Sequence, residues 1–418
     1  MKQQLKLRLD GKTFEVPKGT RFLELAKQFS SGYTSPILLV TLNGILHELG
    51  TTVEEEGELR FLTIQDKAGY QSYERSAILL LLAAYHNLYG ERNAAVWIDY
   101  KESGALRCRI AGRQAVTETE LARLEAEMRT LVAAAHPIEK RSVPTREAIR
   151  LFAARGMQDK AELLRFRIYS SVNLYRLGEY EDYFYGYMLP DSSYLTVFSL
   201  RPYEDGFILC LPAQRLPMQL AAFQPSQKIF RAMEESRESL SRQKIETVGA
   251  LNARAASGKM KELILCTEAQ MEKRIGDLAE KICRRNAVRI VLIAGPSSSG
   301  KTTFARRLTT QLSALGKTPH AIEVDNYFKN RSDTPRDEKG NFDFESLGAL
   351  DVDCFNRDLN ALLRGERVEL PRFDFISGER RYSGDFLQCS PSDILLVEGI
   401  HCLNEALSFS IPVEKKSM

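Results

Sequence analysis

The chain has 418 residues, of which 44% are apolar and 27% are charged, as is typical of a soluble globular protein. The net charge of +3 is too small to indicate nucleic-acid binding by itself. The longest apolar run, Ala77 to Tyr85, is about half of a membrane span, and the N-terminus lacks a signal-peptide core. The sequence therefore predicts a cytoplasmic protein without a membrane span, and the length favours roughly three domains.

Cysteine usage agrees with this setting. The seven cysteines contain no C-x-x-C pair, so the spacing indicates neither a zinc site nor a disulfide framework. Such usage favours a reducing compartment.

Residues 1–65 have the pattern of a small β-rich module. Leucines alternate over residues 5–9, an Asp10-Gly11 turn follows, and alternation resumes to Val16, which predicts a β-hairpin. Thr20 before an amphipathic run predicts a capped helix, and strands flank Asn43-Gly44. This ββαββ order resembles the TGS domain, a β-grasp fold. The resemblance implies an RNA-facing or regulatory module, and a module that only packs against its neighbour is the alternative.

Residues 66–230 predict an α+β region. Helical periodicity covers residues 73–89 and 118–135, and strand-like stretches cover 95–100, 196–200 and 206–212. Segments 124–156 and 175–190 resemble the second additional domain, or editing region, of threonyl-tRNA synthetase. Its place after a TGS-like module strengthens the resemblance.

The region departs from that family where the family binds metal. The four positions that carry His or Cys in the synthetase hold Arg75, Leu79, Phe184 and Met188. None of these is a plausible metal ligand, so we expect an editing-like fold without editing chemistry. His86 and His136 are expected to be surface or packing residues. The Tyr-rich stretch 179–187 could stack on bases or form a half-buried aromatic strand.

Residues 231–286 predict a helical linker, with breaks at Gly249 and at Ser257-Gly258. Apolar positions at helical spacing in its second half predict a helix that packs on the domain that follows.

The apolar run 288–294 leads into G-x-x-x-x-G-K-T, followed by a helical pattern, which is the phosphate-binding P-loop. Glycines let the loop turn its N–H groups inward, and the helix start adds partial positive charge. Lys301 is expected to reach the β- and γ-phosphates of ATP and Thr302 to ligate Mg²⁺. An ordinary glycine-containing turn is the alternative. The predicted nucleotide-binding residues are Gly295, Pro296, Ser297, Ser298, Ser299, Gly300, Lys301, Thr302 and Thr303.

Two carboxylates follow later strands. Asp325 ends the strand 319–324, and Glu398 ends the strand 394–398. Functional groups gather at the carboxyl ends of parallel strands, so Asp325 is expected to activate an acceptor hydroxyl and Glu398 to lie near Mg²⁺. A helix N-cap is the alternative for Asp325. Asp393 has the pattern of a turn residue, and His401 is expected at most to support the ligands.

Five motifs in residues 288–405 occur in the order found in the uridine kinase and phosphoribulokinase family, which this region resembles: GPSSSGKTT, DNYFKN, NFDFESLGALD, LPRFDFISGERR and LLVEGIH. The resemblance implies ATP- and Mg²⁺-dependent phosphorylation of a nucleoside 5′-hydroxyl. Asp325 matches the catalytic base and Glu398 the Mg²⁺-associated acid. The residues that match substrate positions are Tyr327, Phe328, Asp343 and Phe373.

The sequence does not decide which molecule accepts the phosphate. Uridine kinases commonly carry YDFxxHxR, and Phe373 and Gly378 replace the Tyr and His that read the base. Hydrogen bonds to a base edge contribute much of the discrimination between acceptors. Because these two side chains are missing, pyrimidine nucleosides, other nucleosides and sugar alcohols are all candidate acceptors. A nucleotide-sensing protein that contacts RNA or the ribosome through residues 1–230 is the second hypothesis.

The sequence thus predicts a multidomain α+β and α/β protein: 1–65 TGS-like, 66–230 editing-like, 231–286 linker and 287–418 P-loop kinase. We count three strands in the last domain, and twenty residues follow Glu398. This favours a truncated kinase domain that binds phosphate poorly and catalyses little. The oligomeric state is not indicated.

Overall fold

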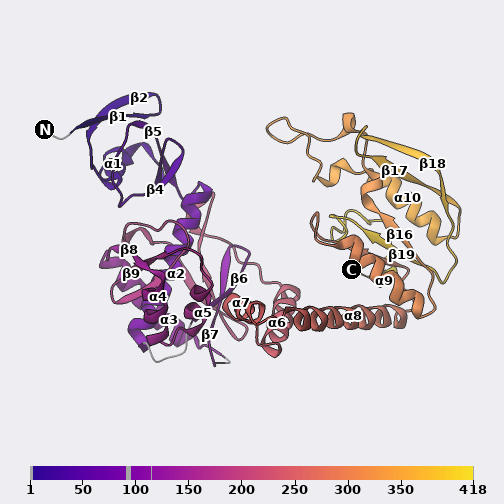
Figure 1. Ribbon diagram of the computed structural model, residues 1–418. Helices are drawn as coiled ribbons and strands as arrows, with labels where there is room; N and C mark the ends of the chain where they lie inside the picture. Colours follow the sequence, from indigo (N-terminus) through magenta and orange to yellow (C-terminus); the bar gives the residue numbers. More distant parts are fainter. Residues whose placement is uncertain (1–2, 91–95, 114, 418) are drawn as a thin grey trace. The chain divides into compact units, whose positions relative to one another are not determined.

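The computed structural model describes residues 3–90, 96–113 and 115–417. They form two compact units, Met1–Lys259 and Met260–Met418, coloured from indigo to rose and from rose to yellow in Figure 1. The chain passes from one unit to the other inside the predicted linker. Among the described residues, we find no helix that combines the length and the apolar character needed to cross a membrane.

The first unit begins with a five-stranded sheet in the order β2-β1-β5-β3-β4, in which only β1 and β5 pair in parallel. Leu9 pairs with Lys12, and positive φ at Asp10 and Gly11 makes the predicted tight turn. Thr20 is not the cap of the helix, since its hydroxyl donates to Pro17 O instead. The elements are β1 (Gln4–Leu9), β2 (Lys12–Pro17), α1 (Phe22–Phe29), β3 (Ile37–Leu42), β4 (Ile45–Glu48) and β5 (Gly57–Thr63).

The rest of the first unit is built around one long helix, α2 (Lys67–Tyr89), which is buried along most of its length. Two antiparallel sheets, β10-β9-β8 and β11-β12-β7-β6, surround it with further helices. The elements are β6 (Val96–Glu102), β7 (Ala105–Ile110), α3 (Glu118–Ala133), β8 (Ile138–Pro144), α4 (Thr145–Ala154), α5 (Gln158–Arg165), β9 (Ser171–Leu177), β10 (Tyr180–Tyr183), β11 (Ser199–Tyr203), β12 (Gly206–Cys210), β13 (Pro212–Ala213) and β14 (Leu216–Leu220).

The predicted helices of this region are confirmed, and its strands are confirmed in part. The strand expected at 196–200 begins only at Ser199, and Ala95 of the expected strand 95–100 lies outside the described residues. Within the Tyr-rich stretch, Tyr180 is buried and its ring packs on His86, whereas Tyr185 is exposed. The half-buried aromatic strand is therefore the interpretation that the structure favours.

The β-grasp sheet is tied to the second region through its own strands. Leu38 of β3 and Ile64 after β5 belong to the apolar core around α2. Glu48, the last residue of β4, accepts hydrogen bonds from the Tyr175 hydroxyl and the Met188 N–H and pairs with Lys140. Apolar packing and one buried carboxylate thus connect the two parts of this unit.

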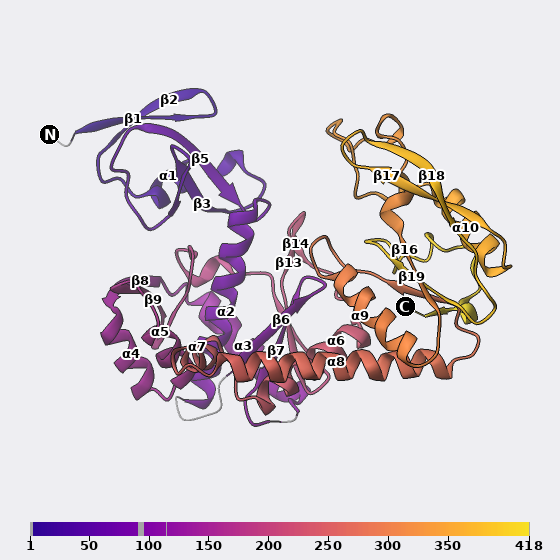
Figure 2. The same cartoon turned by 45° about the vertical axis from the view of Figure 1, so that its right-hand side comes forward.

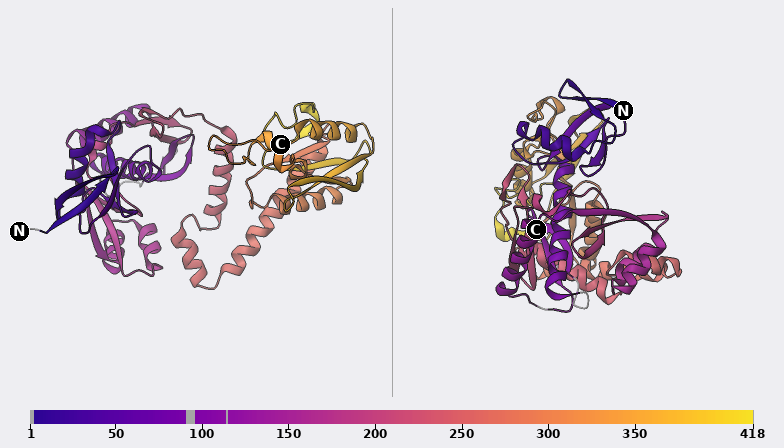
Figure 3. Two further views of the ribbon diagram at one scale, coloured as in Figure 1. Left: turned by 90° about the horizontal axis from the view of Figure 1, so that it is seen from above. Right: turned by 90° about the vertical axis from the view of Figure 1, so that its left-hand side faces the viewer.

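Three separate helices make up the predicted linker (Figure 3): α6 (Gln227–Arg242), α7 (Val248–Ala256) and α8 (Met260–Arg284). The predicted break at Ser257-Gly258 is confirmed, with Gly258 at φ +74°. The break at Gly249 is wrong, because Gly249 lies inside α7. A Cβ there would meet the Leu163 backbone nitrogen at 2.8 Å, so this glycine permits the close approach of α7 to α5.

The second unit is a parallel sheet with helices on both faces, seen well in Figure 2. Strands run in the order β16-β19-β15-β20. One face of the sheet packs on α8 and α9, and the other packs on α10, so alternate residues of each strand are buried on opposite sides. This explains why the strand is apolar throughout residues 290–293. The elements are β15 (Ile290–Ile293), α9 (Lys301–Ala314), β16 (Pro319–Glu323), α10 (Val352–Leu363), β17 (Val368–Asp374), β18 (Glu379–Leu387), β19 (Ile394–Glu398) and β20 (Lys416–Ser417).

The structure confirms that α8 packs on this domain, through Ile275, Ala279 and Ile282, and corrects the expected number of strands. The count of three strands is wrong, because β20 pairs in parallel with β15 as a fourth. Lys416 can be buried there because its ammonium donates to the backbone and hydroxyl oxygens of Ser408. The antiparallel hairpin β17–β18 was not anticipated.

Candidate functional site

The predicted P-loop joins the end of β15 to the start of α9, as the sequence indicates. Gly300 at φ +88° and Ser298 at φ +61° turn the chain. A Cβ on Gly295 would lie 2.6 Å from Ser299 Oγ and 3.2 Å from Lys301 Cγ, so only glycine lets the loop close over the lysine. Lys301 Nζ donates to Pro296 O at 3.0 Å. The ammonium thus lies across the loop, next to the helix start that favours anions.

The two predicted carboxylates lie at the same edge of the sheet as this loop. Strand register pairs Glu398 with Ile293 on one side and with Glu323 on the other. Asp325 follows Glu323 within a short 3₁₀ turn and caps no helix in this structure. The structure therefore brings the P-loop, Asp325 and Glu398 together, as expected for the carboxyl ends of parallel strands.

Electrostatic coupling joins these groups. Partial burial raises the pKa of the Asp325 carboxyl, Lys301 opposes that rise, Glu398 adds to it as a like charge, and His401 opposes it. The balance keeps the pKa above the ordinary value for aspartate. A carboxylate with a raised pKa is a better proton acceptor than an unperturbed one, as a general base requires.

Glu398 also provides a test of whether this edge fits a hard cation. Its Oε2 atom is buried and has no hydrogen-bond partner among the described residues. An unpaired buried carboxylate oxygen is costly, and a bound Mg²⁺ would satisfy it, since this ion prefers oxygen ligands. The Thr302 hydroxyl at the start of α9 offers a second oxygen. The residues present therefore fit Mg²⁺.

His401 lies near the same two carboxylates. Its charge acts on Asp325, which places the side chain at the same edge of the sheet, and its Nε2 is buried without a hydrogen-bond partner in the described structure. The only signal in the sequence was its position three residues after Glu398, which does not reveal the direction of the ring.

The predicted substrate residues divide into two groups. Phe328, Phe373 and Phe375 form an aromatic cluster with ring centroids 5.1–6.2 Å apart, and Phe375 is 61% exposed. Tyr327, in contrast, is only 1% exposed and packs edge-on against Phe355. The expectation that the Tyr327 ring lines an acceptor pocket is wrong for this structure, because η3 (Val324–Tyr327) turns that side chain into the core.

Asp343 and Gly378 have local roles in the backbone. The Asp343 carboxylate accepts the N–H groups of Glu345 and Ser346, so one of its oxygens stabilises a turn. Gly378 closes the β17–β18 turn at φ +73°, where a Cβ would lie 2.8–3.0 Å from Arg331. A side chain such as the histidine of the YDFxxHxR motif would therefore fit at this turn only if Arg331 moved.

The four altered positions of the first unit contain packing and structural groups. Leu79 and Met188 are buried, and the Arg75 guanidinium donates to Tyr187 O.

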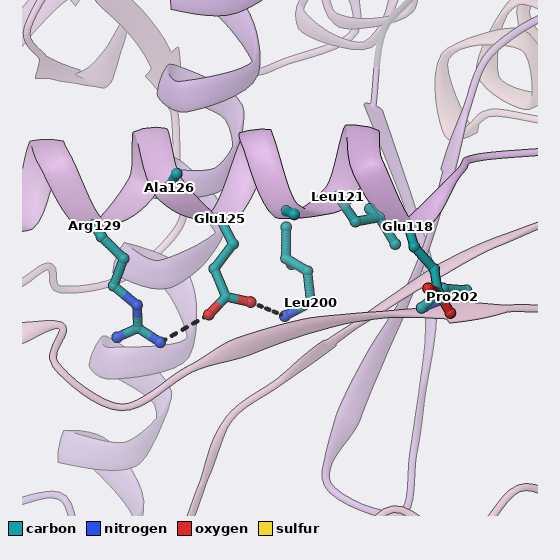
Figure 4. A pocket seen from close by; sticks show the side chains of 8 residues that line it. Glu118, Leu121, Glu125, Ala126, Arg129, Leu200 and Pro202 are labelled. Atoms are coloured by element: carbon teal, nitrogen blue, oxygen red, sulfur yellow. Dashed lines mark hydrogen bonds and ion pairs between the residues drawn. The ribbon is translucent and has the colours of Figure 1, made fainter.

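A hollow of about 500 Å³ in this unit lies between α3 and β11. There Glu125 binds the Arg129 guanidinium and the Leu200 N–H (Figure 4). Glu125 and Arg129 thus serve to hold α3 against β11.

Gly399 holds the carboxyl edge together and allows a prediction. A Cβ at this position would lie 2.6 Å from Val324 Cβ, so Gly399→Ala must push apart the residues that carry Asp325 and Glu398. We expect a loss of stability of about 1–3 kcal/mol and a lower rate of any reaction at this edge. Thermal unfolding and steady-state kinetics measure the two effects. Gly276→Ala in α8 is the matched control, because its nearest neighbour would be at 3.6 Å; equal behaviour of the two variants would contradict the prediction.

A P-loop and two acidic side chains at the carboxyl edge of one parallel sheet form the arrangement that is typical of P-loop phosphotransferases. Residues 290–407 match the model of the Phosphoribulokinase / Uridine kinase family. The chain therefore carries a domain of this family in its C-terminal part.

Individual relatives match different parts of the chain. A uridine kinase of Halobacterium salinarum is 33% identical over 127 residues, 29% of this chain and 54% of that protein. A threonine–tRNA ligase of Carboxydothermus hydrogenoformans is 28% identical over 187 residues, 44% of this chain and 29% of the ligase. A solved structure described as a possible uridine kinase from Bacillus stearothermophilus is 25% identical, with a TM-score of 0.28, over 33% of this chain and 76% of that one. The chain thus spans about half the length of the uridine kinase and under a third of the ligase.

Proposed function

We propose that the second unit transfers the γ-phosphoryl group of ATP to the 5′-hydroxyl of a nucleoside. The observation that carries this proposal is the common position of the P-loop, Asp325 and Glu398 at the carboxyl edge of β15, β16 and β19. Similarity of this unit to uridine kinases supports the acceptor class. The N-terminal parts are proposed to be a TGS-like β-grasp module and an editing-like region without metal ligands.

Each residue would have a separate task. The loop N–H groups and Lys301 would bind the phosphates and neutralise charge on the transferring group. Asp325 would orient the acceptor hydroxyl and accept its proton, for which its raised pKa is suited. Mg²⁺, held by Thr302, Glu398 and the phosphates, would supply charge neutralisation. This division explains why a lysine, a hydroxyl and two carboxylates gather at one edge.

The aromatic cluster supports a planar acceptor. Phe328 lies three residues after Asp325, and Phe373 lies in β17, just before the turn at Gly378. Their rings contact each other. Stacking on these rings would hold a base whatever groups its hydrogen-bonding edge carries. Phe373 and Gly378, which stand in place of the Tyr and His, offer no hydrogen-bonding side chain to that edge. We therefore expect broad acceptance of nucleosides, with Phe328 and Phe373 contributing affinity more than discrimination.

The test is phosphate transfer from labelled ATP to a panel of nucleosides and sugar alcohols, with Asp325→Asn as the negative control. Transfer to nucleosides that the variant loses supports the proposal. Transfer only to a sugar alcohol would refute the nucleoside acceptor and keep the phosphotransferase. ATP binding without any transfer would refute the kinase proposal for this chain and favour nucleotide sensing.

Nucleotide affinity gives a prediction that does not depend on turnover. Lys301→Ala removes a charge-assisted contact of about 1.5–3 kcal/mol to the phosphates, so the Kd for ATP should rise about 10- to 100-fold. Titration calorimetry measures it. Lys317→Ala is the matched control, since Lys317 follows the far end of α9. Equal ATP affinity of the two variants would contradict the predicted phosphate role.

A second candidate function rests on the similarity of the first unit to threonine–tRNA ligases over 44% of the chain. We propose as the alternative that this unit contacts RNA while the P-loop senses a nucleotide. RNA affinity that falls steeply with salt would support phosphate contacts by basic side chains. Absence of binding at low salt to both tRNA and ribosomal RNA would leave the first unit as a packing module.

A further inference from the structure

A second group of chemically reactive side chains lies in the kinase-like unit, away from the P-loop. His320 is the second residue of β16, Asp393 directly precedes β19, and Cys389 lies four residues before Asp393. One ligand atom from each residue lies within 4.8 Å of the others. Because β16 and β19 are parallel, these residues occupy the amino edge of the sheet, opposite the edge that carries Asp325 and Glu398.

The backbone around these side chains is fixed by neighbouring strands. Ile394 N–H donates to Thr318 O at 3.0 Å and sets the register that places His320 beside Asp393. A turn over residues 390–393 closes through Asp393 N–H and Ser390 O. Arg289, just before β15, donates to both carbonyls of this turn, at 2.8 Å to Asp393 O and 2.7 Å to Ser390 O. Sites supported in this way by strands keep their geometry well.

The side chains themselves are already oriented toward one another. His320 Nε2 lies 3.0 Å from Asp393 Oδ2, and the Ser390 N–H donates to the same oxygen at 2.9 Å. Cys389 is 4% exposed and Asp393 is 6% exposed, whereas His320 is half-buried. The group therefore has a solvent-accessible entrance on the histidine side and a closed, buried side formed by the thiol and the carboxylate.

We propose that His320, Cys389 and Asp393 form a binding site for a divalent d-block cation, with Zn²⁺ as the best match. Imidazole nitrogen, thiolate sulfur and carboxylate oxygen are the three ligand types that Zn²⁺ takes in proteins, at about 2.0–2.3 Å. Binding releases the thiol proton to solvent, and the resulting thiolate and carboxylate are balanced by the two positive charges of the ion. The hard ion Mg²⁺ would not choose a thiolate and imidazole set.

The ion would join two segments that are distant in sequence, His320 in β16 and residues 389–393 before β19. His320 and Asp393 already touch, so the change on binding is a small rotation that replaces their hydrogen bond by two bonds to the metal. A fourth position remains for water, as in three-ligand zinc sites. A metal here would fasten the segment between β18 and β19 to β16, and it would act on stability without touching the P-loop edge.

The test uses the full 418-residue chain, stripped of metal and held in excess Mg²⁺, with Co²⁺ as the spectroscopic probe. Wild type is expected to bind one equivalent of Co²⁺ with a cobalt–thiolate charge-transfer band, which Zn²⁺ abolishes by displacement. Cys389→Ser should lose the band. Cys402→Ser is the matched control and should keep it, because Cys402 is the buried thiol near Glu398 and Asp325 at the opposite edge.

Two further variants keep the test decisive if Cys389→Ser does not fold. His320→Gln and Asp393→Asn should each weaken Co²⁺ affinity at least about tenfold. The proposal is overturned if wild type shows no thiolate band, if Cys389→Ser retains the band, or if both His320→Gln and Asp393→Asn bind Co²⁺ as tightly as wild type. In those cases, the His320–Asp393 hydrogen bond serves only to join β16 to β19.

Discussion

Replacing Asp325 by asparagine is expected to reduce kcat for phosphate transfer by about 10²–10⁴-fold, the usual contribution of a general base. The amide keeps the size of the side chain but cannot accept the proton of the acceptor hydroxyl. Because Asp325 follows β16 at an accessible turn and caps no helix, the fold should survive the change. Steady-state kinetics with saturating ATP measures the effect, and the Kd for ATP should change little.

Asp353→Asn is the matched control for this variant. Asp353 is an exposed aspartate in the first turn of α10, and the change should leave kcat within about twofold, since surface changes of this kind alter little. A similar loss of rate in both variants would mean that Asp325→Asn acts through the fold. Full activity of Asp325→Asn would assign the base to another group, and His401 is the first candidate because its charge reaches the same carboxylate.

The pH dependence of the rate is a second measurement that distinguishes wild type from Asp325→Asn. A general base works only when deprotonated, so kcat/KM should fall as pH falls through the pKa of Asp325. Partial burial, and to a lesser degree Glu398, raise that pKa above its ordinary value of 3.8, so the acid limb should lie at a higher pH than for an unperturbed aspartate. The limb should disappear in Asp325→Asn, with the residual rate flat over that range. A limb that survives the substitution would belong to a different group.

The sequence contained enough information to predict this edge of the sheet but not the surroundings of each side chain. The P-loop spacing and the acidic residues at the ends of two strands predict that Lys301, Asp325 and Glu398 meet, because parallel strands bring their carboxyl ends together. No comparable rule gives the direction of Tyr327. The motif matched a pocket residue, and the 3₁₀ turn placed its ring in the core against Phe355.

Features that depend on tertiary pairing were missed for the same reason. β20 has only two residues and exists because it pairs with β15, and Gly249 stays helical because α7 packs closely on α5. The cysteine spacing likewise gave no indication of the group that we propose as a cation site, since His320 and Asp393 are brought together only by the register of β16 and β19. Local propensity cannot report such contacts.

Glu48→Ala is expected to have the second large effect, on the contact between the β-grasp sheet and the region that follows. Glu48 is 9% exposed and accepts from the Tyr175 hydroxyl at 2.7 Å and the Met188 N–H at 3.0 Å. Removing the carboxylate leaves the Met188 N–H without its acceptor, at about 1–3 kcal/mol for one unsatisfied buried group, whereas the Tyr175 hydroxyl can still donate to Gly186 O at 3.0 Å. We expect a loss of about 1–3 kcal/mol in the free energy of unfolding of the first unit, from urea titration.

Amide hydrogen exchange localises the effect. Protection of the Met188 N–H should fall in Glu48→Ala, because this amide then opens to solvent whenever the β-grasp sheet moves. Glu54→Ala is the matched control in the same module, where Glu54 makes only exposed contacts with Thr52 and Lys18, and it should cost under about 1 kcal/mol. If both variants unfold at the same urea concentration and Met188 stays protected, apolar packing through Leu38 and Ile64 alone holds the two parts together.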